Sequence, residues 1–191
     1  MGVYDLIIKR RTIRKFKQEK IKKDILIDCL NAARLAPSAA NLQPLEYILV
    51  TRALDKVFEC TRWAGYLKNG KPRQHERPVA YIVIISNKEV SNDAKYDAGF
   101  AASNIILTAL ERGVASCVIG SIDRERLAKN LSIPKNYNIE LVIALGYGKQ
   151  KSVEEEFKGD VRYWLDEKGI LHVPKKRLED IVHEERFLGK P

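Results

Sequence analysis

Residues 96–120, YDAGFAASNIILTALERGVASCVIG, carry the clearest structural pattern in the chain. Apolar side chains occupy most faces of residues 95–112, which predicts a helix that is buried on nearly every side. Gly113 follows directly and is placed to end this helix as a C-cap. Residues 114–119 are mainly β-branched or small and predict a strand. A helix, a stop and a strand therefore follow one another without a long loop.

The same periodicity and capping rules predict the other elements. Helices are expected at residues 3–9, 23–36, 54–61 and 124–131, with Asp123 as N-cap of the last, and strands at residues 46–51, 79–86 and 139–145. Because helices and strands mix without strict βαβ alternation, the fold class is α+β. After Gly148 the chain is charged and has no core pattern, so we expect it to wrap a neighbouring surface.

Composition restricts the class of protein. A chain of 191 residues with 31% charged and 45% hydrophobic residues predicts one folded domain, without a membrane span. The N-terminus has no secretory pattern, which predicts a cytoplasmic protein.

Three widely spaced cysteines predict reduced, buried thiols, and the three histidines lack ligand spacing, so no metal is expected. The net charge of +9 suits nucleic acid, a membrane surface or a phosphorylated cofactor, but the basic residues are scattered and no nucleic-acid motif accompanies them.

Three clusters carry polar groups suited to ligand binding. Residues 10–14, RRTIR, offer guanidinium groups and a hydroxyl to a phosphate, or form a solvated basic turn. Residues 36–44, APSAANLQP, combine small side chains with amides, which suits a flat heterocycle or a proline-bounded turn. At Gly120 and Ser121 a strand meets a helix, and the exposed backbone amides suit an acceptor atom or belong to an ordinary turn.

The order of these blocks, from RRTIRKF through APSAANLQP and the segment quoted first to ELVIALGYG, resembles the FMN-dependent nitroreductase family. The similarity runs from about Tyr4 to Gly148, and VPKKRLEDIV at residues 173–182 extends it to nearly the whole chain. The resemblance implies an α/β sandwich with a mostly antiparallel central sheet, built as an intertwined homodimer with two FMN sites at its interface. Residues 1–191 then form one domain, with residues 149–191 as an extension that embraces the partner.

The resemblance also implies residue roles. Arg10 and Thr12 would hold the FMN phosphate and ribityl end together with Arg11, and Arg14 would lie by the phosphate or the pyrimidine rim. Further cofactor contacts would come from Pro37, Ser38, Ala39 and Asn41 of the partner, from Ile119, Gly120 and Ser121 near N5, and from Lys175 or Lys176 at the phosphate.

The chain departs from the family pattern in ways that bear on the substrate. Thr12 replaces the usual serine, Leu45 replaces a common tryptophan, and Ser103 replaces a frequent glutamine. The loop at residues 68–77 is either a lid over the flavin or a solvated excursion. Beside it, Trp63 and Tyr66 are candidates for substrate stacking, or are packing anchors.

The implied function is hydride transfer from NADH or NADPH through FMN to nitroaromatics, quinones or related small acceptors by a ping-pong mechanism. One alternative is a flavin-dependent dehydrogenase or reductive dehalogenase with one physiological substrate. The other is a non-enzymatic flavin- or nucleic-acid-binding protein. FMN leaves the protein only the tasks of binding, orienting and tuning, so the chain needs no catalytic dyad.

Overall fold

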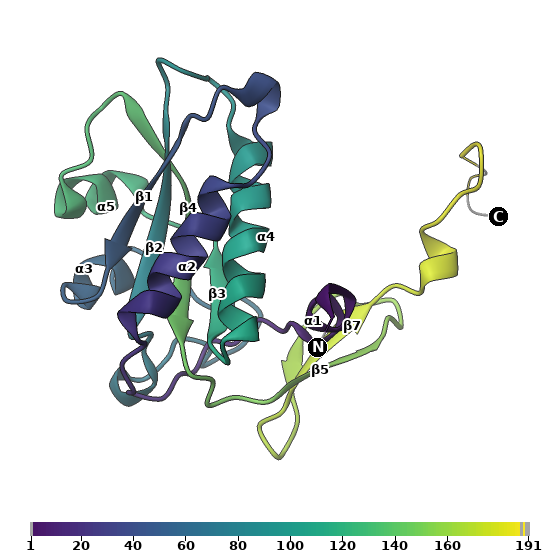
Figure 1. Cartoon of the computed structure of the whole chain (residues 1–191). Helices are drawn as coiled ribbons and strands as arrows, with labels where there is room; N and C mark the ends of the chain where they lie inside the picture. The colour runs from purple at the N-terminus through teal and green to yellow at the C-terminus, as the bar shows by residue number, and fades with distance from the viewer. Residues whose placement is uncertain (1, 188, 190–191) are drawn as a thin grey trace.

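A four-stranded antiparallel sheet forms the centre of the molecule in a computed structural model that describes residues 2–187 and 189 (Figure 1). Its strands are β1 (Leu45–Val50), β2 (Ala80–Asn87), β3 (Ala115–Ile119) and β4 (Tyr137–Gly146), in the order β1-β2-β4-β3. Each neighbouring pair is antiparallel. The predicted α+β class and antiparallel sheet are confirmed.

The helices lie close to their predicted positions. They are α1 (Val3–Lys9), α2 (Lys23–Arg34), α3 (Leu54–Phe58), α4 (Lys95–Glu111) and α5 (Arg124–Leu131), with 3₁₀ turns at Ala39–Asn41, Gln74–Glu76 and Leu178–Asp180. Asp123 caps α5 by accepting a hydrogen bond from the Arg126 amide at 3.1 Å. Gly113 takes a φ of +73°, a left-handed conformation that glycine adopts without strain, and thereby ends α4.

Strand β2 explains the layering, because its residues are buried on both faces of the sheet. Ile82 and Ile84 point to the side covered by α2 and α4, which lie next to each other in Figure 1. Tyr81, Val83 and Ile85 point to the opposite side, towards α3 and α5. Successive side chains of a strand alternate between faces, so one apolar run supplies two cores.

Helix α4 differs from its prediction. Its side towards the sheet and α2 is buried, but Tyr96 is 80% exposed and Phe100 is 52% exposed. The expectation that this helix is buried on nearly every side is therefore wrong for the single chain. Apolar composition predicts burial without saying whether the covering surface belongs to the same chain.

The segment after Gly148 also differs, because it contains strands. It forms a second sheet of β5 (Ser152–Glu156), β6 (Trp164–Leu165) and β7 (Leu171–Lys175), with β5 and β7 parallel. Strand β5 carries three consecutive glutamates, β6 has only two residues and β7 contains Pro174, so the period-two apolar pattern that reveals a strand is weak. In Figure 1 this segment leads away from the central sheet, and it passes beside α1.

All three cysteines are buried and unpaired, as predicted. Among the residues described, no helix combines the length and apolar character needed to cross a bilayer.

Candidate functional site

The predicted phosphate cluster runs alongside β3. Thr12 forms an isolated parallel bridge with Ser116, and the Ile13 amide donates to the Ser116 carbonyl at 2.9 Å. Because the two segments run in the same direction, Arg10 lies towards the start of β3 and Arg14 towards its end. Residues 10–14 thus run along the β3 edge of the sheet, with Arg10 at its start and Arg14 near residues 119–121 at its end.

Arg10 and Arg11 lie in a pocket of about 250 Å³ at the start of that edge. Its polar lining is Lys9, Arg10, Arg11, Ser116, Gln150 and Ser152. The buried Ser152 hydroxyl has no hydrogen-bond partner in the part of the chain that the structure describes. An unpaired buried hydroxyl among basic side chains is the arrangement that an anionic ligand would satisfy.

Arg11 is already engaged within the chain. Its guanidinium binds the Glu154 carboxylate at 2.5 Å and donates to the Ile8 and Arg10 carbonyls at 2.7 and 2.8 Å. These bonds tie α1 to β5. The Arg10 guanidinium makes no hydrogen bond within residues 2–187 and 189, which leaves its donors for a ligand.

At the other end of the β3 edge, Arg14 contacts the first of two aromatic residues that pack against each other. Its guanidinium lies over the Tyr163 ring, 4.7 Å from the centroid, and Tyr163 packs against Tyr66 with ring centroids 5.0 Å apart. The Arg14 amide also donates to Gln150 at 3.3 Å. Tyr66 is therefore brought beside the predicted pyrimidine rim. Sequence reasoning missed Tyr163 and Ser152, since neither stands in a recognisable motif.

The turn after β3 leaves room for a ligand at Gly120. A Cβ built on Gly120 would meet only Leu141, at 3.9 Å. The Ser121 carbonyl accepts from the Arg62 amide at 3.0 Å, and the Arg124 guanidinium donates to the Gly120 carbonyl at 3.4 Å. Ile119 is buried beneath the turn. The backbone of this turn is thus fixed by hydrogen bonds to its carbonyl groups, while the space next to the Gly120 Cα is unfilled.

The loop at residues 36–44 is fixed by its own hydrogen bonds. The Ser38 hydroxyl donates to Asp97 at 2.6 Å and accepts from the Gln43 amide at 2.8 Å, while the Ala39 amide donates to Asp97 at 3.2 Å. Asn41 has a φ of +54° and is exposed, and Pro37 is exposed as well. The loop presents its small residues and the Asn41 side chain on a rigid turn.

One chain does not bring this loop to the Arg10 pocket. Asp97, which holds the loop, lies in the first turn of α4, whereas Leu110 near the end of α4 lines the pocket. Leu110 follows Asp97 by 13 positions of the helix, which is a rise of about 20 Å. The two groups of predicted ligand-binding residues therefore stand at opposite ends of α4.

Lys175 and Lys176 are also apart from the pocket within one chain. Both are exposed, and Lys175 pairs with Glu156 at the far end of β5 from Ser152. Four strand residues correspond to about 13 Å. The phosphate contact predicted for these lysines stays a prediction that a second chain would have to satisfy.

Trp63 packs in the core. It is 9% exposed, its indole nitrogen donates to Thr61 at 3.0 Å, and its ring lies 5.7 Å from that of Phe58. These contacts give Trp63 a packing role, and its contact with substrate remains a prediction.

The C-terminal part of the loop at residues 68–77 is anchored to the body. The Phe16 amide donates to the Glu76 carbonyl at 2.9 Å, and the Glu76 carboxylate lies 3.6 Å from the Lys15 ammonium. Burial acts to raise the pKa of Glu76, but the Arg73 amide and Lys15 outweigh it and lower that pKa overall. Pro72 is buried and the Lys71 ammonium lies 4.9 Å from the centroid of the Phe58 ring, so a lid formed by residues 68–77 stays a prediction.

The same blocks of sequence identify the family. A model described as "Nitroreductase family" matches residues 7–147. The chain belongs to the nitroreductase family. A relative from Archaeoglobus fulgidus, provisionally named an NADH dehydrogenase/NAD(P)H nitroreductase, is 31% identical over 83% of this chain and 91% of its own length.

Two further proteins resemble this chain over most of its length. An iodotyrosine deiodinase of Thermotoga neapolitana is 26% identical over 76% of this chain and 88% of its own length. A solved structure of an FMN-dependent nitroreductase from Clostridium difficile R20291 is 28% identical, covers 95% of this chain and 98% of that chain, and superposes with a TM-score of 0.69.

Proposed function

We propose that this chain binds FMN and passes reducing equivalents from NADH or NADPH to a small organic acceptor, such as a nitroaromatic compound or a quinone. The observation that carries the proposal is the pocket that joins Arg10 and Arg11 to the unpaired, buried hydroxyl of Ser152. Family membership and the names of the relatives support it.

The residues present fit the cofactor. Arg10, Thr12 and Ser152 would hold the phosphate, Arg14 would lie at the pyrimidine rim, and the open backbone at Gly120 would admit the flavin ring. When bound, FMN supplies the redox chemistry. The chain itself would orient the ring, and the Tyr66–Tyr163 pair would lie on its Arg14 side.

The complete site would need two chains. In a homodimer, Pro37, Ser38, Ala39 and Asn41 of one protomer, and Lys175 or Lys176, would meet the Arg10 pocket of the other. Exposed apolar side chains on α4, on α1 and in the C-terminal extension support this arrangement: Tyr96 and Phe100, Tyr4 and Ile7, and Leu178 and Phe187. Residues 149–191 would embrace the partner as an extension of a single domain. The cytoplasmic location stays a prediction from the sequence.

A ping-pong order follows if one flavin face serves both substrates. The sequence has no GxGxxG motif for a separate nicotinamide site, which supports that order. Double-reciprocal plots at several acceptor concentrations should then be parallel. Intersecting plots would show that both substrates bind at once.

The deciding experiment is spectroscopic. The purified protein should be yellow, release one FMN per chain on denaturation, lose its flavin absorbance on anaerobic addition of NADH or NADPH, and regain it with a quinone or nitroarene. A colourless protein that takes up no added FMN would overturn the proposal.

A reductive dehalogenase is the second candidate, favoured by the aromatic pair Tyr66 and Tyr163 beside Arg14 and by the deiodinase relative. Such an enzyme replaces an aryl carbon–halogen bond with a carbon–hydrogen bond, consumes two electrons and one proton, and releases halide. Halide release from a halotyrosine under dithionite, faster than the reduction of nitroarenes, would select this function.

A further inference from the structure

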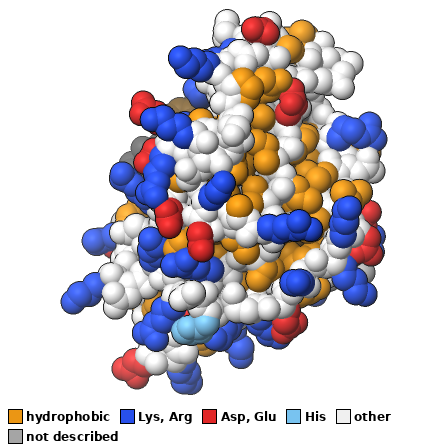
Figure 2. All heavy atoms as spheres, turned by 90° about the vertical axis from the view of Figure 1, so that its left-hand side faces the viewer, with side chains coloured by type: hydrophobic (Ala, Val, Ile, Leu, Met, Phe, Trp, Pro, Cys, Tyr) orange, Lys and Arg blue, Asp and Glu red, His pale blue; other side chains and the backbone are white. Residues whose placement is uncertain are grey.

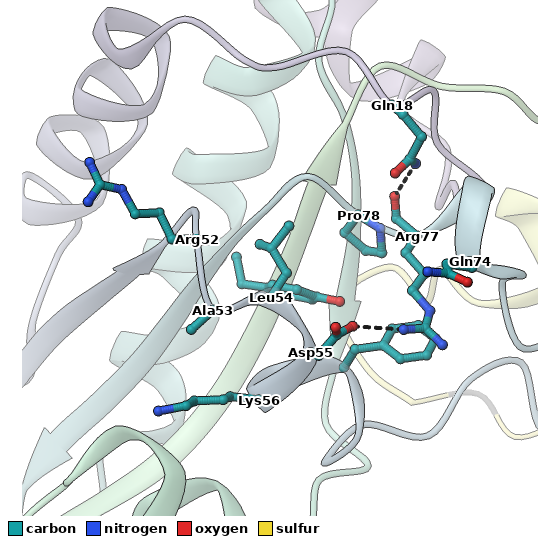
Figure 3. Close-up of a pocket in the computed structure, with 11 residues that line it drawn as sticks. Gln18, Arg52, Ala53, Leu54, Asp55, Lys56, Gln74, Arg77 and Pro78 are labelled. Carbon is teal, nitrogen blue, oxygen red and sulfur yellow. Dashed lines mark hydrogen bonds and ion pairs between the residues drawn. The ribbon is translucent and has the colours of Figure 1, made fainter.

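A larger pocket, of about 340 Å³, lies beside α3 and shares no lining residue with the Arg10 pocket. In Figure 3, Arg52 and Lys56 stand on one side of it, Gln18, Gln74 and Arg77 on the other. We call it the α3 pocket. Figure 2 views the side of the molecule that carries α3 and shows Lys and Arg side chains around an uncovered apolar strip.

Two buried donors of the α3 pocket lack partners. Tyr81 is 0% exposed, and neither its hydroxyl nor the buried Nε of Arg77 has a hydrogen-bond partner among the described residues. Burial raises the pKa of Tyr81, so its hydroxyl keeps its proton and remains a donor. Buried polar groups in folded proteins are nearly always paired, so two unpaired donors in one pocket point to an acceptor that binds there.

Arg77 is held in place by three contacts. Its Nη1 donates to Asp55 at 2.7 Å, its guanidinium lies 4.0 Å from the centroid of the Phe58 ring, and its carbonyl accepts from Gln18 at 2.9 Å. The dashed lines of Figure 3 mark the bonds to Asp55 and Gln18. Because Asp55 and Phe58 fix the guanidinium plane, the Nε donor is pre-organised for a ligand.

The charges at the α3 pocket favour an anion. Arg52, Lys56 and Arg77 line the pocket with one carboxylate, Asp55, which is already paired with Arg77, while the head groups of Arg52 and Lys56 point to its outer side (Figure 3). Leu54 and Pro78 supply an apolar wall for the rest of a ligand. The volume falls within the range of small-molecule sites, about 300–1,000 Å³, and exceeds the needs of a single bound water.

We propose that the α3 pocket binds a small molecule with an oxyanion group, such as a phosphate monoester, whose oxygen accepts hydrogen bonds from the Tyr81 hydroxyl and the Arg77 Nε. The apolar part of the ligand lies against Leu54 and Pro78. The site is separate from the FMN site and does not depend on the proposed function.

The test is calorimetric titration of FMN-saturated protein with phenyl phosphate, benzoate and phenol, so that added phosphate does not compete for the flavin site. Phenyl phosphate should bind with one site per chain, more tightly than benzoate, and phenol should bind least. Binding of phenol as tight as that of phenyl phosphate, or no heat at millimolar phenyl phosphate, would overturn the proposal. If the protein retains no FMN, phenyl phosphate is titrated into the FMN-free chain and into its Arg10→Ala variant. Binding that the variant keeps belongs to the α3 pocket, and binding that it loses belongs to the Arg10 pocket.

Tyr81→Phe gives the sharpest control, since it removes only the unpaired hydroxyl. It should leave the unliganded protein as stable as before or more stable, and weaken phenyl phosphate binding by about tenfold. Arg52→Gln combined with Lys56→Gln should weaken binding by about fivefold or more, whereas Lys88→Gln, an exposed charge in the turn after β2, should not. Unchanged affinity in both Tyr81→Phe and the double variant would contradict the assignment.

Discussion

The guanidinium of Arg14 lies over the ring of Tyr163, 4.7 Å from its centroid, and so joins the N-terminal segment to the C-terminal extension. Both residues are partly buried. Together with the Arg11–Glu154 ion pair, the contact couples the predicted flavin edge to the extension.

We predict that Tyr163→Leu lowers the free energy of unfolding by about 0.5–1 kcal/mol, because a partly exposed cation–π contact contributes about that much. Tyr163→Phe keeps the ring and should stay close to wild type. Urea denaturation measures both. Equal losses in the two variants would assign the effect to the hydroxyl instead of the ring.

Alanine substitutions at Gly120 and Gly146 test two different effects, the approach of the ligand at Gly120 and core packing at Gly146. Gly120→Ala should leave stability within about 0.5 kcal/mol of wild type, because the new Cβ meets only Leu141, and should weaken FMN binding by about tenfold or more. Gly146→Ala is the matched control, since its Cβ would lie 2.8 Å from the buried Phe16 ring. It should lose about 1–3 kcal/mol of stability. Unchanged FMN affinity in Gly120→Ala would remove the flavin from this turn.

Ser152, which lines the Arg10 pocket, and Ser86, which lies outside it on β2, make a similar pair of variants. The Ser152 hydroxyl is buried and unpaired, so Ser152→Ala should not destabilise the free protein but should weaken FMN binding by about 1.5 kcal/mol or more. Ser86 donates to Glu140 at 2.6 Å, so Ser86→Ala should cost about 1–3 kcal/mol of stability and leave FMN affinity unchanged. Fluorescence titration with FMN and urea denaturation provide both readouts, and a Ser152→Ala protein that binds FMN normally would contradict the phosphate assignment.

Buried thiols make stability fall at alkaline pH. Burial raises the pKa of Cys29 and of Cys117 from 9.0 to about 11. Between those values the unfolded chain has lost protons that the native protein retains, so this stabilisation is complete below pH 9 and disappears as pH rises towards 11. The double variant Cys29→Ala, Cys117→Ala should show a flatter decline in denaturation midpoint over that range. An identical decline would assign the alkaline loss to other groups.

Local signals in the sequence predicted the central elements well. Helix α5 begins at Arg124 and ends at Leu131, as expected, because its periodicity and the Asp123 cap are properties of neighbouring residues. The second sheet was not predicted, since β5 and β7 pair at long range, β5 carries three consecutive glutamates and β7 contains Pro174. The exposed face of α4 was not predicted either, because apolar sequence marks a surface for burial without specifying which chain covers it.

The residues of the candidate site also fall into a group that local motifs predict and a group that they do not. Motifs predicted Arg10 and Gly120 as ligand-binding residues, and the structure brings their segments to one edge of the sheet, while their contact with FMN stays a prediction. Ser152 and Tyr163 reach that edge through the path of the extension, which no pattern in the sequence reveals.

The length of α4 has a genetic consequence. If the Arg10 pocket of one chain is completed by the Asn41 loop of another, then Arg10→Ala and Asn41→Ala damage different halves of each site, and each variant alone should retain little FMN. Mixing the two after reversible unfolding would produce hybrid dimers in which one site carries both lesions and the other carries none. Random reassortment of subunits would restore about a quarter of all sites to the native set of side chains. Two inactive proteins should therefore regain activity when they are refolded together, a form of intragenic complementation.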